Sequence, residues 1–164
     1  MARFLSPTDG RATGVGGLPH TDSDRAVDDV LAAFPDVPYA PGLPNRGPFE
    51  QIVWNDAKTL PGLEVVDGRL VIDLEADHAE AMERVYLDFV EQNAAAYGPD
   101  PDTYSGLLEL VSRDLSSAVL VKAQVTGPVT FGMQVIERDK RPILYDESYA
   151  DLLGKMLALR VRAV

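Results

Sequence analysis

The sequence has 164 residues and a mass of 17.8 kDa, which predicts a single domain spanning residues 1–164. The net charge of −11 argues against a nucleic-acid or anionic-membrane partner, because such partners are bound by Lys and Arg. The absence of cysteine excludes disulfides, cysteine nucleophiles and thiolate zinc sites. The first residues lack the apolar segment of a signal peptide, and no apolar run approaches the roughly 20 residues of a membrane span. We therefore expect a soluble, cytoplasmic protein.

The first third of the chain predicts short strands around one helix. Residues 12–16 predict a strand that enters a glycine turn. Thr21 and Asp24 then resemble a capping box, and apolar residues at helical spacing follow until Pro35. Residues 37–40 predict a second strand. A connection rich in proline and glycine leads from there to a short helix over 49–57, with Ile52 and Val53 facing inward.

The clearest local signal is at residues 65–72, where Asp67-Gly68 between apolar pairs predicts a two-residue β-hairpin. A long helix is expected over 75–97, because its apolar residues form one stripe and acidic residues crowd its first turns. The later elements that the sequence predicts are a short helix at 104–114, a strand at 118–125, a helix from Pro128 to about Arg138, and a last helix from about Asp146.

Strands separated by helices indicate an α/β fold with parallel core strands, on which the hairpin is an insertion. The candidate core strands are 12–16, 37–40 and 118–125, which is few for a closed α/β fold.

The glycine-rich turn after the first strand is the first candidate site. Gly14-Val15-Gly16-Gly17 lacks the last glycine of a dinucleotide-binding motif, because Pro19 stands in that place. The turn is either purely structural, or it brings backbone N–H groups close to a small ligand at the end of the strand. His20 adjoins this turn, but His20 and His78 without cysteines do not indicate a metal site.

A second candidate lies at the end of the strand at 118–125. Lys122 and Gln124 precede the turn Thr126-Gly127-Pro128. A lysine in an apolar strand needs either a polar partner or access to water. From the residues alone, the prediction is a possible small-molecule site near Gly14–His20 and Gln124–Thr130.

Together the two segments resemble a known family. Residues 12–19, Ala-Thr-Gly-Val-Gly-Gly-Leu-Pro, resemble the T-T-x-I-G-S-x-P motif of cobalamin-independent methionine synthases. Residues 121–130, Val-Lys-Ala-Gln-Val-Thr-Gly-Pro-Val-Thr, resemble their later K-x-x-x-T-G-P-V-T motif. The turn at 41–46 also resembles short bacterial methionine-synthase-like proteins. The superfamily includes uroporphyrinogen decarboxylases.

This resemblance implies the N-terminal half of a (β/α)8 TIM barrel, with the hairpin outside it. It implies methyl transfer to a thiol such as homocysteine, whose amino-acid part would be held by the backbone of Val15, Gly16 and Gly17. Gly17 replaces the usual serine of the motif. His20, Gln124 and Thr126 would complete the substrate pocket.

The zinc that activates the thiol in this family is held by residues of the other half of the barrel. We therefore expect no cofactor in this chain, and no methyl transfer by the chain alone. Two other functions stay open. One is a binding or assembly module without catalysis. The other is a metal-free decarboxylase that would use Arg11, Arg46 and Asp36. The last predicted helix reaches Val164 without a capping residue, which favours part of a longer barrel over a short module.

A half-barrel would leave open strand edges and uncovered apolar faces, so the sequence also predicts a homodimer. The residues expected to be uncovered are Val119, Val121, Ala123 and Val125, together with Leu153, Met156 and Leu157 of the last helix.

Overall fold

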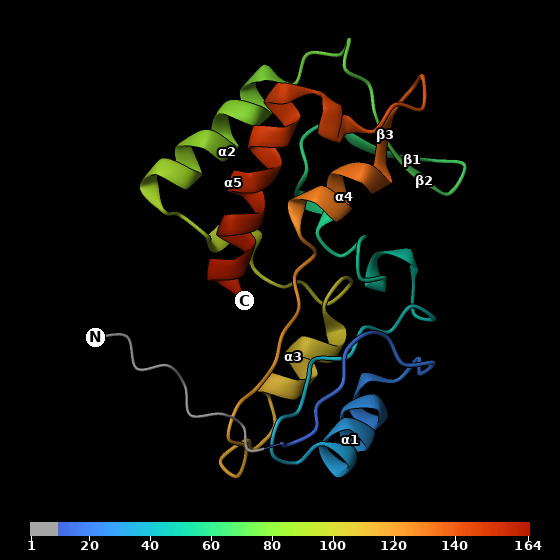
Figure 1. The fold of residues 1–164 in the computed structure, drawn as a ribbon, viewed down its shortest axis with the longest axis vertical. Helices are drawn as coiled ribbons and strands as arrows, with labels where there is room; N and C mark the ends of the chain where they lie inside the picture. The colour runs from blue at the N-terminus through green and yellow to red at the C-terminus, as the bar shows by residue number, and fades with distance from the viewer. Residues whose placement is uncertain (1–9) are drawn as a thin grey trace.

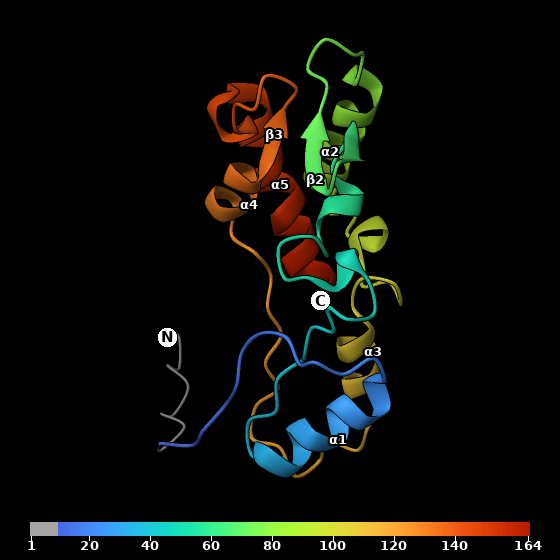
Figure 2. The same cartoon turned by 90° about the vertical axis from the view of Figure 1, so that its right-hand side faces the viewer.

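The computed structural model describes residues 10–164, whose elements gather in two lobes along an elongated molecule (Figures 1 and 2). The N-terminal lobe consists of α1 (Ser23–Ala33), α3 (Ser105–Val111) and the extended segments 14–18, 37–43 and 118–124. The C-terminal lobe holds the other helices, α2 (Ala79–Glu91), α4 (Pro128–Gln134) and α5 (Glu147–Ala163), and the sheet. Short 3₁₀ turns occur at Pro48–Glu50, Ala57–Thr59, Ala95–Tyr97 and Ile143–Tyr145.

The sheet has three strands in the order β1 (Leu63–Val66), β2 (Arg69–Ile72) and β3 (Val135–Glu137). β1 and β2 are antiparallel, with Val66 opposite Arg69, and β3 runs parallel to β2, with Val135 opposite Leu70. The protein is therefore α/β. The predicted hairpin is confirmed, but it forms two of the three strands of this sheet and is not an insertion outside it.

The predicted half TIM barrel is wrong. Segments 12–16, 37–40 and 118–125 form no regular strands in the described structure. Backbone pairing in this region is limited to isolated parallel bridges, Gly17 with Gly42 and Tyr39 with Lys122. The physical reason lies in their composition. Pro38 and Pro41 have no N–H to donate, and Gly16 has a φ of +103°, outside the strand region. The three-stranded sheet of the other lobe is far too small for half of such a barrel.

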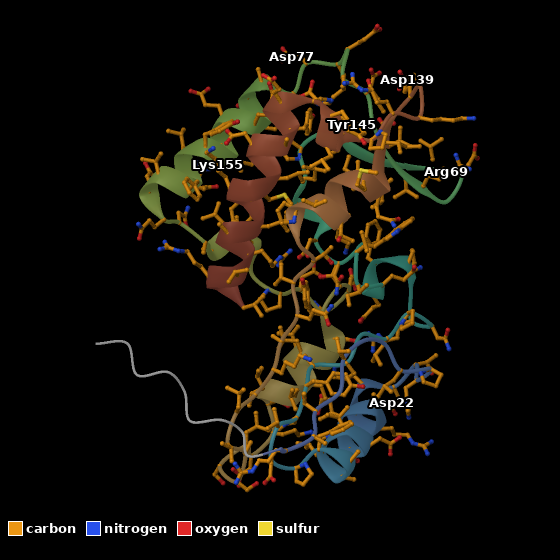
Figure 3. All side chains as sticks on the ribbon, viewed as in Figure 1. Asp22, Arg69, Asp77, Asp139, Tyr145 and Lys155 are labelled. Carbon is orange, nitrogen blue, oxygen red and sulfur yellow. The ribbon has the colours of Figure 1, made fainter. Side chains whose placement is uncertain are left out.

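Helix α5 carries the core of the C-terminal lobe. The side chain of Asp146 accepts a hydrogen bond from the N–H of Tyr149 (3.0 Å) and caps its first turn. Leu153, Met156 and Leu157 are buried against α2, α4 and the sheet, so the prediction that they are uncovered is wrong. On the side of α5 that faces α2, the ammonium group of Lys155 lies 5.0 Å from the ring of Tyr86 (Figure 3).

Helix α2 is shorter at both ends than the predicted range of 75–97. Before it, the side chains of Asp73 and Asp77 accept hydrogen bonds from the N–H groups of Glu75 and Ala79. Such local turns compete with helical hydrogen bonds, which explains the later start. At its C-terminal end, Gln92 adopts a left-handed conformation (φ +58°) that ends the helix.

The N-terminal lobe has a smaller core of its own, built around the buried residues Ala26, Val27 and Val30 of α1 and Leu107 and Leu110 of α3. Its first helix is capped by Asp22 and not by the predicted Thr21, because the Asp22 side chain accepts from the N–H of Asp24. No helix within residues 10–164 has the length and apolarity to cross a membrane.

The hairpin turn gives a direct stability prediction. Asp67 and Gly68 both have positive φ values (+49° and +71°), as a type I′ turn requires. We expect Gly68→Ala to cost about 1–2 kcal/mol, because a Cβ disfavours the left-handed region. Gly47→Ala is the control, since its φ of 172° suits any residue and its Cβ would meet no atom within 4 Å. Equal urea midpoints for the two variants would contradict this prediction.

Candidate functional site

The two motif segments come together through backbone hydrogen bonds to the chain between them. The N–H of Leu18 donates to the carbonyl of Gly42 (2.9 Å), and the N–H of Gly42 donates to that of Gly16 (3.3 Å). On the other side of segment 37–43, the N–H of Ala40 donates to the carbonyl of Lys122 (2.8 Å). Segment 37–43 therefore lies between the two motifs, and all three segments run parallel.

A cavity of about 280 Å³ lies where these segments end. The first motif contributes Gly16 and Gly17, and the second contributes Ala123 and Gln124. The remaining wall comes from the middle segment, from residues 50–55, which lead towards the C-terminal lobe, and from α3 with the loop before it. These lining residues are Ala40, Pro41, Gly42, Pro44, Glu50, Gln51, Ile52, Asn55, Thr103, Tyr104 and Leu107.

Glycine is favoured at this wall because the chains approach closely. A Cβ on Gly17 would lie 3.0 Å from Cδ of Pro44, and a Cβ on Gly42 would lie 3.0 Å from the carbonyl oxygen of Glu50. A Cβ on Gly16 would meet no atom within 4 Å, but the φ of +103° at this position favours glycine. The serine of the methionine-synthase motif would therefore be crowded at position 17.

Glu50 is the one charged residue among the residues that line the cavity. Only 2% of it is exposed. Its two carboxylate oxygens accept hydrogen bonds from the N–H of Leu43 (3.3 Å) and of Ser105 (3.2 Å), and Nε of Arg46 lies 3.5 Å from Oε1. These contacts stabilise the buried carboxylate and tie three separate segments together.

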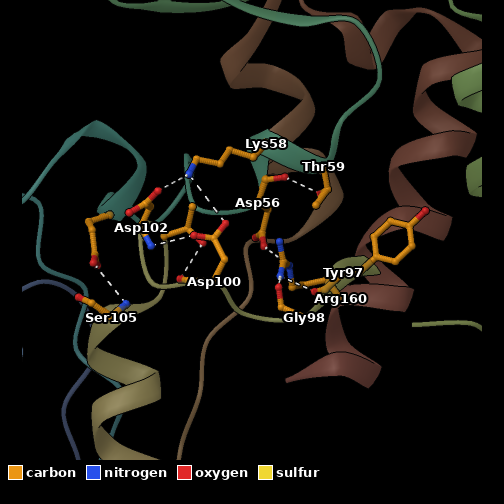
Figure 4. Close-up of polar contacts among 11 residues, drawn as sticks. Asp56, Lys58, Thr59, Tyr97, Gly98, Asp100, Asp102, Ser105 and Arg160 are labelled. Atoms are coloured by element: carbon orange, nitrogen blue, oxygen red, sulfur yellow. Dashed lines mark hydrogen bonds and ion pairs between the residues drawn. The ribbon is translucent and has the colours of Figure 1, made fainter. Parts of the chain in front are cut away.

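Behind the cavity lies a second buried polar cluster, formed by Asp56, Tyr104 and Arg160. Figure 4 shows Asp56 facing Arg160. The hydroxyl of Tyr104, which also lines the cavity, donates to Oδ1 of Asp56 (2.6 Å), and Nε of Arg160 lies 2.9 Å from the same oxygen. The guanidinium group also donates to the carbonyls of Tyr97 and Gly98. This cluster joins the cavity wall to α5 of the C-terminal lobe.

The cluster shifts the pKa values of its members. Burial raises the pKa of the Asp56 carboxyl, and the contacts with Tyr104 and Arg160 oppose that shift. Burial first, and the neighbouring Asp56 second, raise the pKa of Tyr104 above its ordinary value. Tyr104 is therefore a neutral hydrogen-bond donor at physiological pH.

The structure separates the residues predicted for the substrate pocket. Gly16, Gly17 and Gln124 line the cavity. Val15 exposes 63% of its surface, and the ring of His20 pairs with Asp29 of α1 (2.9 Å from Nε2 to Oδ2). Neither residue lines the cavity. Thr126 is buried beside it and donates its hydroxyl hydrogen bond to the carbonyl of Ile52.

Sequence reasoning did not find Glu50, Asn55 or Tyr104, because none lies in a recognisable motif. The expected helix at 49–57 was only the two 3₁₀ turns Pro48–Glu50 and Ala57–Thr59 with a loop between them, and Ile52, expected inside, is 40% exposed. Lys122 has the polar partner that a lysine in an apolar segment needs, since its ammonium group donates to the carbonyl of Gly14 (3.0 Å).

The described residues do not fit a zinc site. Within residues 10–164, no three His, Asp or Glu side chains converge to hold a metal ion. His20 is paired with Asp29, and Nε2 of His78 lies 2.9 Å from the carbonyl oxygen of Asp73. The residues considered for a decarboxylase are also paired, Arg11 with Asp36 and Arg46 with Glu50.

Comparison of the chain with family models, with curated proteins and with solved structures gave no match.

Proposed function

We propose that this chain binds a small polar molecule in the cavity between its two motifs, as the substrate-binding part of a methionine-synthase-like methyltransferase. One observation carries the proposal. The motifs that prompted the resemblance are about a hundred residues apart, yet Gly16 and Gly17 of the first and Gln124 of the second line one cavity. The absence of cysteine supports a cytoplasmic protein.

The size and polarity of the cavity support a ligand no larger than an amino acid. Its volume of about 280 Å³ lies just below the roughly 300–1,000 Å³ of sites for drug-sized ligands. Amide side chains at Gln51, Asn55 and Gln124 offer both donors and acceptors. A thiol amino acid such as homocysteine has this size and chemistry. Because the described residues offer no zinc ligands, the proposal covers binding of the substrate and assigns no catalytic step.

Ligand binding is tested by thermal unfolding with L-homocysteine and L-methionine. A ligand at a hundred times its Kd stabilises the folded state by about 2.7 kcal/mol, which raises Tm by several degrees in a chain of this size. We expect Gln124→Ala to weaken binding about 2- to 10-fold through loss of one neutral hydrogen bond.

Gln134→Ala is the matched control, because Gln134 is exposed on α4 and does not line the cavity. It should bind like the unmodified chain. The proposal fails if neither amino acid raises Tm at millimolar concentration, or if the two glutamine variants lose affinity equally.

A further inference from the structure

One stretch of the chain differs from the rest in charge. Residues 115–136 contain no acidic residue, and Lys122 is their one charged side chain, in a chain whose net charge is −11. The ammonium group of Lys122 is already bound to the carbonyl of Gly14. This stretch therefore adds no acidic side chain of its own to the electrostatic repulsion between two copies of this acidic chain.

The same stretch exposes apolar side chains. In Figure 2, segment 115–127 runs up from the N-terminal lobe and leads directly into α4. The exposed residues are Val119, Leu120, Val121 and Ala123 in the segment and Val129 and Met133 on α4. Several exposed apolar side chains within one short stretch mark an interaction site more often than an isolated exposed valine does.

The segment also has a free backbone edge. The N–H of Lys122 donates to the carbonyl of Pro38 (2.9 Å), and the carbonyl of Lys122 accepts from the N–H of Ala40 (2.8 Å). Both groups therefore point towards the neighbouring segment. In an extended chain, successive residues point their N–H and carbonyl groups to opposite sides, so those of Val121 and Ala123 point away from the neighbouring segment. Within residues 10–164, the backbone groups of Val121 and Ala123 have no hydrogen-bond partner. Such an edge can pair with another extended segment.

From these observations we propose that a second copy of this chain docks on the edge at Val121–Ala123. Two copies related by a two-fold axis pair their edges antiparallel, so that the same surface serves both partners. The two-fold axis passes beside Val121, so the N–H and carbonyl groups of Val121 bond those of Val121 in the second copy. A stable interface buries at least about 1,200 Å², so the contact extends from the edge to the exposed face of α4. Ala123 and Gln124 also line the cavity, which places this dimer contact beside the cavity wall.

The mass in solution tests the contact. We expect size exclusion with light scattering at 10–100 µM to give twice the mass of the 17.8 kDa chain. Val121→Asp should shift the chain to monomer, because it places two like charges at the axis. Val90→Asp is the matched control. It makes the same change at a residue that is 77% exposed on α2, away from the edge, and it should remain a dimer.

Cross-linking provides a second, independent measurement. Because the chain contains no cysteine, Val121→Cys introduces a single thiol near the two-fold axis. Mild oxidation should convert most of this variant to a disulfide-linked dimer on a non-reducing gel, and Val90→Cys should stay monomeric on that gel. A monomeric unmodified chain at 100 µM overturns the proposal, as does a dimer that Val121→Asp leaves intact while circular dichroism shows both proteins folded.

Discussion

Replacing Arg160 with methionine should lower the free energy of unfolding by about 3–5 kcal/mol, because it leaves a buried carboxylate without its ion-pair partner. Asp56 is fully buried, and only 2% of Arg160 is exposed. The guanidinium group also satisfies two main-chain carbonyls, at Tyr97 and Gly98, and its carbon lies 5.1 Å from the ring centre of Tyr104. Methionine fills similar space but replaces none of these polar contacts.

The double variant Asp56→Asn/Arg160→Met separates the charge from the packing. The asparagine keeps an oxygen that can accept the Tyr104 hydrogen bond, but it is uncharged and so needs no ion-pair partner. We expect it to recover more than half of the stability lost in Arg160→Met, as measured by urea unfolding. If the double variant is less stable than Arg160→Met, the buried charge is not the source of the loss.

The loss in Arg160→Met should also depend on pH. Burial raises the pKa of Asp56 in the folded chain, and removing Arg160 raises it further because a contact that opposes the shift is lost. A carboxyl whose pKa is raised by folding binds more protons in the folded state. Such a carboxyl therefore lowers the free energy of unfolding as pH rises from its pKa in the unfolded chain, about 3.9, through its raised pKa in the folded chain.

The stability gap between Arg160→Met and the unmodified chain should consequently narrow as pH falls below the raised pKa of the variant. The double variant has no titrating group at position 56, so its stability gap to the unmodified chain should not narrow as pH falls. Urea unfolding at pH 5, 6 and 7 measures both gaps. Parallel pH profiles for the two variants would contradict this account of Asp56.

The hairpin was predictable from the sequence because its determinants are local. Asp67 and Gly68 fix the turn through their own φ values, and the flanking residues fix the register of β1 and β2. Parallel strands have no such local determinant. Segments 12–16 and 118–125 look like strands in sequence, but they become strands only if a neighbour supplies hydrogen bonds along their length, and prolines 38 and 41 of the segment between them have no N–H to donate.

The candidate site was predictable only in part, for a related reason. The glycine turn and the Gln124 segment are contiguous motifs, and their meeting at one cavity follows from the parallel bridges. Glu50 is different. It becomes part of the wall because N–H groups of Leu43 and Ser105, far apart in sequence, make its burial possible. The pairing of Asp56 with Arg160 is likewise a consequence of tertiary structure that no spacing in the sequence indicates.

Gly106→Ala should destabilise the chain by about 2–3 kcal/mol, the upper range for overpacking a well-packed interior. Gly106 lies in the first turn of α3, where a Cβ would stand 2.0 Å from the carbonyl oxygen of Pro41. That carbonyl belongs to main chain and not to a flexible side chain. Its neighbours Ala40 and Gly42 are each hydrogen-bonded to one of the motif segments. Segment 40–42 can therefore move away from the added Cβ only by breaking those hydrogen bonds.

The same change should weaken any ligand bound in the cavity, because Pro41 and Leu107 on either side of the clash both line it. Gly154→Ala provides a control of opposite sign. Gly154 is exposed in the middle of α5, and a Cβ there would meet no atom within 4 Å, so alanine should stabilise the helix by up to about 1 kcal/mol. Urea unfolding of both variants measures the difference, which should exceed 2 kcal/mol. If Gly106→Ala proves as stable as Gly154→Ala, α3 does not pack closely against segment 40–42, and the cavity wall that they share is not formed in solution.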